Sequence, residues 1–117
     1  MSITMQNAKH MDFSDVAYGD IPKRLPTAPG EYLKTEFLDE LGLSAYALAR
    51  ATHMPDSRLS EIINGKRAIT ADTALRLAKY FGMSAQFWLN LQSHYDLEMT
   101  RREVADDIDT IEPYDIA

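Results

Sequence analysis

Short apolar stripes with helical spacing, separated by stop signals, constrain the fold of this chain more than any other feature. Tyr32, Leu33, Phe37 and Leu41 recur at three- and four-residue spacing, and Gly42 follows them as a stop signal. The same spacing returns in later segments up to about residue 102. Because such a stripe lies along one face of an α-helix and needs an apolar partner, the pattern predicts an all-α fold of five helices.

Each expected helix has a start or stop signal of its own. Ser44, Thr70 and Ser84 are good N-caps, and Gly42 and Gly82 favour the left-handed backbone that ends a helix. The sequence around Pro55 breaks the second helix, and the pair Asn64-Gly65 ends the third. The helices are therefore expected over residues 30–40, 44–51, 56–64, 70–81 and 84–102.

Two flanking segments lack this pattern. Residues 1–28 show no helical period and contain two prolines and a glycine, and they predict a flexible N-terminal extension. Residues 103–117 alternate acids with isolated apolar residues, and they predict an acidic C-terminal tail. One folded domain is expected between them, over residues 29–102.

The distribution of charge matters more than its total. The formal net charge of the 117 residues is −6, but residues 42–80 hold six basic and three acidic residues, a net charge of +3. Nucleic-acid binding is therefore not excluded, because the basic charge gathers in one segment. The chain has no cysteine, no signal peptide and no membrane-spanning apolar run, so a reducing, cytoplasmic location is expected.

Residues 43–65 have the pattern of a helix-turn-helix. Ala49 is small where the second and third helices must approach closely, and apolar residues stand where their crossing is packed. The apolar set is Leu48, Met54, Leu59 and Ile62. Such a pair of short helices fits DNA because the major groove, about 12 Å wide, admits one helix while the other braces it. The sequence therefore predicts a DNA-binding protein.

Residues 29–98 resemble the HigA-type antitoxins within the repressor-like (XRE) helix-turn-helix family. The segments that carry the resemblance are Pro29-Gly30-Glu31, Leu43-Ser44, residues 57–62, residues 64–67, residues 69–77 and residues 87–92. His53 departs from the pattern, since it occupies the turn position where glycine is commonest. Histidine tolerates a left-handed backbone better than branched residues do, so this departure weakens the turn only slightly.

The resemblance implies the antitoxin of a type II toxin–antitoxin module. Such a protein binds a HigB-type toxin, an mRNA-cleaving protein of the RelE-like class, and represses its own operon. It usually acts as a homodimer on operator DNA that contains an inverted repeat. A stand-alone helix-turn-helix repressor without a toxin partner remains the alternative.

The resemblance implies DNA contacts on and around the third helix, which would be the reading helix, because residues there match the family's base- and phosphate-contacting positions. Arg58 is the leading specificity residue, because arginine can address guanine O6 and N7 together. Asp56 and Glu61 either read cytosine or merely cap and solvate a helix, and Tyr46 either touches phosphate or packs between helices. The full set is Ser44, Tyr46, Asp56, Ser57, Arg58, Glu61, Asn64, Lys66, Arg67 and Thr70.

Two further surfaces are expected outside the reading helix. Apolar residues of the fifth helix should belong mainly to the core and extend into a dimer interface; they are Phe87, Trp88, Leu91 and Tyr95. Isolated apolar residues of the acidic tail are candidate anchors for a basic toxin; they are Ile108, Ile111 and Tyr114. The alternative for the tail is a disordered, solubilising end.

No catalytic residue, metal site or cofactor is expected. His10, His53 and His94 are too far apart in sequence for the paired spacing of a helical zinc site. The sequence has no G-x-S-x-G motif, no glycine-rich phosphate loop and no cysteine nucleophile. A small hydrolase therefore has no support, and the chain is interpreted as a binding protein.

Overall fold

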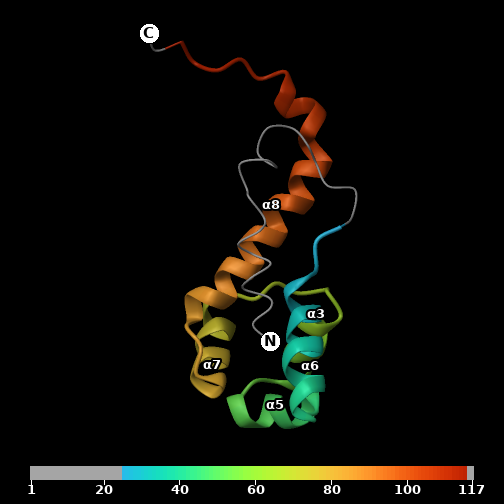
Figure 1. Cartoon of the computed structure of the whole chain (residues 1–117), viewed down its shortest axis with the longest axis vertical. Coiled ribbons are helices and arrows are strands. Elements are labelled where there is room, and N and C mark those ends of the chain that lie inside the picture. The colour runs from blue at the N-terminus through green and yellow to red at the C-terminus, as the bar shows by residue number, and fades with distance from the viewer. Residues whose placement is uncertain (1–24, 116–117) are drawn as a thin grey trace. The chain divides into compact units, whose positions relative to one another are not determined.

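Helices supply the regular structure of residues 25–115, which are the residues that the computed structural model describes (Figure 1). No strand occurs among them, so the predicted all-α class is confirmed. Residues 1–24 of the expected N-terminal extension lie outside the described part. The described residues fall into two units, one from Thr27 to Tyr95 and one that includes Leu25, Pro26 and residues 96–115.

The first helix is continuous but contains a wider turn. It consists of α3 (Pro29–Leu33), the π-helical turn η1 (Lys34–Leu38) and α4 (Asp39–Leu41), and it ends at Gly42 with φ of 65°. A π turn takes up an additional residue. Leu33 and Leu38 are five positions apart and are both buried. The helix was predicted at nearly these bounds, but the π turn was not.

The remaining helices agree closely with the predicted stop signals. They are α5 (Ala45–Thr52), α6 (Asp56–Ile63), α7 (Ala71–Phe81) and α8 (Ala85–Asp109). Gly65 and Gly82, just after α6 and α7, have φ of 76° and 78°. These left-handed conformations are favourable for glycine because it has no Cβ. None of the helices found in residues 25–115 is long and apolar enough to cross a membrane.

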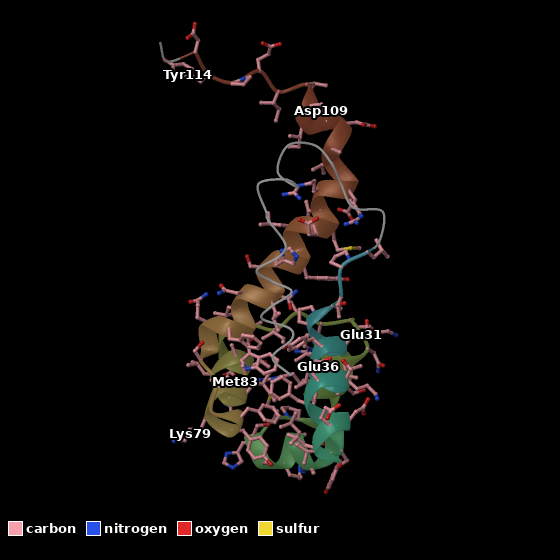
Figure 2. All side chains as sticks on the ribbon, viewed as in Figure 1. Glu31, Glu36, Lys79, Met83, Asp109 and Tyr114 are labelled. Carbon is pink, nitrogen blue, oxygen red and sulfur yellow. The ribbon has the colours of Figure 1, made fainter. Side chains whose placement is uncertain are left out.

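One apolar core lies within the first unit. Side chains fill the space between α3 and α7 (Figure 2), and Trp88 stands among the rings of Tyr32, Phe37, Phe81 and Phe87. Every apolar residue predicted at the helix crossing is buried. The buried apolar set is Leu33, Leu38, Leu48, Ala49, Met54, Leu59, Ile62, Ile69, Ala74, Leu77 and Trp88.

Gly30 lets the first helix approach the backbone of α6. A Cβ atom at this position would overlap the carbonyl oxygen of Ile62 and would lie 2.6 Å from its carbonyl carbon. Only glycine fits such a contact between two backbones without a shift of one helix. The first helix therefore supports the rear of α6 directly.

The expected end of the fifth helix needs correcting. It was predicted at about residue 102, but α8 continues to Asp109, so residues 103–109 are helical. Neither glycine nor proline occurs between Gly82 and Pro113, and Arg101 pairs with Glu98 one turn earlier at 2.7 Å. The acidic composition that indicated a tail does not by itself end a helix. A functional division at residue 102 stays a prediction.

Candidate nucleic-acid interface

Hydrogen bonds fix both the start of α5 and the turn between α5 and α6. The backbone N–H of Ala47 donates to Ser44 Oγ at 3.0 Å, which caps α5 as predicted. His53 has φ of 59°, the left-handed conformation that glycine usually takes. Next to it, the N–H of Met54 donates to the carbonyl of Ala49 at 2.9 Å, and the Met54 side chain is buried. The helix-turn-helix geometry therefore forms with histidine in the turn.

Removing the Ser44 cap tests how much this anchorage contributes. Ser44→Ala is expected to lower the free energy of unfolding by about 1 kcal/mol, because a helix N–H loses its acceptor. Chemical denaturation followed by circular dichroism measures the change. Ser93→Ala, an exposed serine inside α8, is the matched control and should change stability by less than about 0.5 kcal/mol. Equal effects of the two substitutions would contradict a role for the cap.

One face of α6 is polar and exposed. Leu59 and Ile62 are buried on the opposite side, whereas Ser57, Ser60 and Asn64 are exposed at three- and four-residue spacing. Ser57 and Asn64 were predicted as contacts, but Ser60 was not included among them. The alternation of exposed and buried positions along the helix was the sequence signal that could have added it.

The segment after α6 adds basic charge beside this face. Lys66 and Arg67 are exposed in the turn that follows Gly65. The loop is fixed because the N–H of Ile69 donates to Gln92 Oε1 of α8 at 2.8 Å. Thr70 occupies the predicted N-cap position of α7, but its side chain makes no capping hydrogen bond. The Thr70 side chain is exposed.

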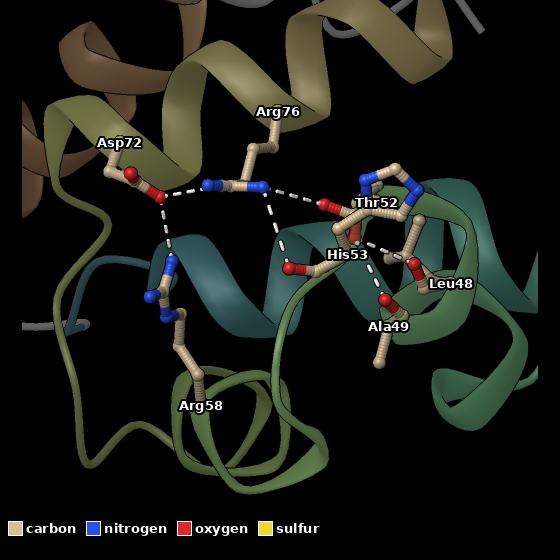
Figure 3. A network of polar contacts seen from close by, with 7 residues as sticks. All are labelled: Leu48, Ala49, Thr52, His53, Arg58, Asp72 and Arg76. Atoms are coloured by element: carbon tan, nitrogen blue, oxygen red, sulfur yellow. Dashed lines mark hydrogen bonds and ion pairs between the residues drawn. The ribbon is translucent and has the colours of Figure 1, made fainter.

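Arg58 is placed differently from the sequence expectation. It was expected at the exposed start of α6, but its side chain is only 27 % exposed and its Nη1 donates to Asp72 Oδ1 of α7 at 2.7 Å. Arg76 Nε donates to the same oxygen at 2.7 Å (Figure 3). Arg76 Nη1 also donates to the carbonyls of Thr52 at 3.1 Å and His53 at 3.4 Å. The Asp72 carboxylate thus connects α6, α7 and the end of α5.

The two guanidinium groups keep this carboxylate charged. Hydrogen bonds from Arg76 and Arg58 lower the pKa of Asp72 below its ordinary value. The hydrogen bond that Arg76 donates to Asp72 in turn raises the pKa of Arg76. Stability from a lowered carboxylate pKa is present above the unfolded value and is lost as pH falls through the folded value. The contact therefore persists at neutral and mildly acidic pH.

The other acids near α6 are paired with arginines as well. Asp56 accepts from Arg50 at 3.2 Å, and Glu61 accepts from Arg67 at 2.7 Å. Arg50 also lies over the ring of Tyr46, with 5.1 Å from its Cζ to the ring centroid. Tyr46 is 62 % exposed, which favours a surface role over packing between helices. These pairs reduce the repulsion that the acids would exert on a phosphate backbone.

The expected dimer surface needs correcting at one residue. Trp88 is fully buried among the other rings of its own chain, because the large indole fills the space between the first helix and α7. It therefore presents no side-chain surface to a second copy. Phe87, Leu91 and Tyr95 are half-buried. Their outer surfaces remain candidates for the predicted interface.

The candidate toxin anchors belong to the second unit and are exposed. Ile108 lies in the last turn of α8, whereas Ile111 and Tyr114 lie in the extended segment that follows. Their exposed fractions are 51 %, 62 % and 86 %. Within residues 25–115, no group of three histidine, aspartate or glutamate side chains has the geometry of a metal site.

Comparison with known proteins identifies relatives over most of the chain. A family model described as "Helix-turn-helix" matches residues 35–88. Virulence-associated protein I of Dichelobacter nodosus is 56 % identical over 75 residues, which cover 64 % of this chain and 69 % of that protein. Antitoxin HigA-1 of Vibrio cholerae is 38 % identical over 91 residues, covering 78 % and 86 % of the two chains. The uncharacterized transcriptional regulator YbaQ of Escherichia coli is 38 % identical over 96 residues, covering 78 % and 85 %.

Comparison with solved structures also identifies HigA antitoxins as similar proteins. The antitoxin HigA of Pseudomonas aeruginosa with the higBA promoter superposes with a TM-score of 0.73 at 45 % identity. The match covers 75 % of this chain and 97 % of that chain. A second solved structure, that of PA4674 from Pseudomonas aeruginosa in complex with its operator DNA, gives a TM-score of 0.74 at 44 % identity and covers 79 % and 97 % of the two chains.

Proposed function

Because this chain belongs to the HigA-type antitoxins of the helix-turn-helix family, we propose that it represses its own operon and neutralises a HigB-type toxin. The observation that carries the DNA-binding part is the exposed polar face of α6 on an anchored turn. Its serines and Asn64 stand beside the exposed cations Lys66 and Arg67. Two solved structures with closely similar folds contain promoter or operator DNA, which supports DNA binding by this chain.

The proposed contacts divide into two kinds. Positions at the start and outer face of α6 read base edges, and positions around the helix ends bind phosphates and set the register. Ser57, Arg58 and Ser60 belong to the first kind. The phosphate set is Ser44, Tyr46, Asn64, Lys66, Arg67 and Thr70. In this arrangement the Asp56 and Glu61 carboxylates are paired with arginines. Either carboxylate could accept a hydrogen bond from cytosine only after its ion pair with the arginine breaks.

Arg58→Ala tests the assignment of base reading. We expect the preference for the operator over unrelated DNA to fall by about tenfold to a hundredfold, since a bidentate arginine–guanine contact contributes about 1–3 kcal/mol of discrimination. Fluorescence anisotropy titration of a specific and a shuffled duplex at fixed salt measures both affinities. Lys34→Ala, which removes an exposed cation of the first helix, is the control and should change neither. Undiminished preference in Arg58→Ala would remove Arg58 from the reading set.

An inverted repeat requires two copies. In a homodimer, the two reading helices would lie about 34 Å apart, the length of one DNA turn. The half-buried side chains of Phe87, Leu91 and Tyr95 supply apolar surface for this contact. Light scattering at tens of micromolar distinguishes a dimer from a monomer, and a monodisperse monomer would contradict the proposed assembly.

The toxin-binding part rests on the second unit. Its exposed apolar residues, Ile108, Ile111 and Tyr114, alternate in sequence with acidic residues. Residues 103–117 contain no lysine, arginine or histidine. An mRNA-cleaving toxin of the RelE-like class must hold phosphates, so an acidic partner complements it. The test is co-expression with the product of the adjacent reading frame, followed by affinity capture and a growth assay. A stable complex that relieves growth arrest supports the antitoxin role.

A stand-alone repressor is the second candidate. The relationship to the transcriptional regulator YbaQ at 38 % identity favours it. If the protein binds its promoter but forms no complex with the co-expressed product of the adjacent reading frame, the stand-alone repressor becomes the favoured function. A cytoplasmic location stays a prediction in either case.

A further inference from the structure

We propose that Asp72 is a positioning residue for DNA recognition. Asp72 holds the Arg58 guanidinium beside the polar face of α6 and thereby increases discrimination between DNA sequences. This inference rests on the proposed DNA binding. Asp72 was not among the residues that the sequence indicated, because it lies on α7, fourteen positions after Arg58.

The first step of the argument is geometric. One carboxylate oxygen, Asp72 Oδ1, accepts from Arg58 Nη1 and from Arg76 Nε, both at 2.7 Å (Figure 3). Arg76 is itself fixed by the carbonyls of Thr52 and His53 at the turn. Asp72, which accepts from Arg58, is therefore connected through Arg76 to the turn that precedes α6. These contacts fix the position of the Arg58 guanidinium relative to α6.

The second step concerns hydrogen-bond capacity. A guanidinium group has five N–H donors in a planar fork, and the contact with Asp72 uses donors of one nitrogen. The side chain retains partial exposure, so its other donors remain available to a base edge or a phosphate. An arginine held in this way loses less rotamer freedom when DNA binds than one that is free in solvent.

The third step concerns charge. The Asp72 side chain is 55 % exposed and ionised, and it lies next to the proposed DNA contact. Its negative charge repels phosphates, which disfavours complexes in which Arg58 finds no base partner. The same residue therefore raises specific affinity through Arg58 and lowers non-specific affinity through repulsion.

The experiment compares Asp72→Asn and Asp72→Ala with the wild type. The specific probe is a duplex selected from a random-sequence library by the wild-type protein, and the non-specific probe is its shuffled version. Specific affinity is expected to fall by about twofold to tenfold, the factor for ordering one long side chain. Non-specific affinity should stay equal or rise. A loss of stability would lower both affinities together, so a fall in specific affinity without a fall in non-specific affinity identifies positioning.

A double-mutant cycle checks that Asp72 acts through Arg58. If it does, Asp72→Ala causes no further loss of discrimination when Arg58 is already alanine. A further loss in that background would assign the effect to Arg76 and the turn, and would overturn the inference. Thermal denaturation of each variant confirms that it is folded.

Asp39→Asn is the matched control. Asp39 is also 55 % exposed and also paired with a cation, Lys34 at 3.0 Å, but it lies on the first helix and is not among the proposed DNA contacts. It should leave the ratio of specific to non-specific affinity unchanged. If Asp72→Asn behaves like Asp39→Asn, the inference is wrong while DNA binding stands. If the wild type selects no sequence from the library, the proposed sequence-specific DNA binding is itself contradicted, and the role of Asp72 falls with it.

Discussion

Trp88→Ala is expected to lower the free energy of unfolding by about 3–5 kcal/mol, the usual cost of truncating a large buried aromatic side chain. The indole is fully buried, and its centroid lies 5.1 Å from the ring of Phe37 and 5.2 Å from that of Phe87. Alanine would leave a cavity in the centre of the first unit, where α8 meets the first helix. Because small domains are stable by only about 5–15 kcal/mol, this one change removes a large share of the total.

Urea denaturation followed by circular dichroism measures the loss, since the variant has no tryptophan to report by fluorescence. Leu41→Ala is the control: Leu41 is also large and apolar but 62 % exposed, so its truncation should cost less than about 0.5 kcal/mol. Similar small losses for both variants would mean that Trp88 is not part of a close-packed core.

Trp88→Phe separates packing from polarity. The indole Nε1 is buried and has no hydrogen-bond partner among residues 25–115. Phenylalanine removes this unsatisfied donor, which offsets part of the lost volume. The phenylalanine variant should therefore retain most of the stability that the alanine variant loses.

Gly30→Ala is expected to destabilise the protein by about 1–3 kcal/mol, the cost typical of overpacking a close contact. The sign is the informative part, because alanine at a helical position ordinarily stabilises by about 1 kcal/mol relative to glycine. Here a Cβ atom would overlap the carbonyl oxygen of Ile62, and a backbone atom cannot rotate away as a side chain can. The first helix would have to move away from α6.

The same denaturation series measures this effect, with Glu31→Ala as the neighbouring control. Glu31 is exposed in the same helical turn, so its replacement should change stability by less than about 0.5 kcal/mol. Because Gly30 contacts the rear of α6, Gly30→Ala should also weaken DNA binding. A variant as stable as the wild type would show that the two helices separate at little cost.

Local sequence signals predicted most of the helical architecture. The capping role of Ser44, the left-handed backbone at His53 and the stop at Gly82 were confirmed within one or two residues, because each depends on interactions within a single turn of chain. The all-α class and the buried apolar face of the helix-turn-helix followed from spacing alone. The family was also evident from the sequence and is supported by the relatives.

The errors arose where the outcome depended on a distant partner. α8 extends beyond its predicted end, because acidic composition does not end a helix in a segment that has neither glycine nor proline. Trp88 was assigned partly to a dimer interface, because sequence does not show how many rings will surround an apolar side chain. Arg58 was expected to be exposed, because its partner Asp72 is on another helix.

By itself, the sequence determined which segments become helices, where all of them except α8 end, and which face of each is apolar. These properties depend on contacts a few residues apart, so periodicity and capping residues encode them directly. Only the tertiary structure decided that Gly30 must be small, that Trp88 is enclosed and that one carboxylate joins Arg58 to Arg76. Such features require atoms from helices far apart in sequence to meet within a few ångströms, and that distance is set by the packing of the whole unit.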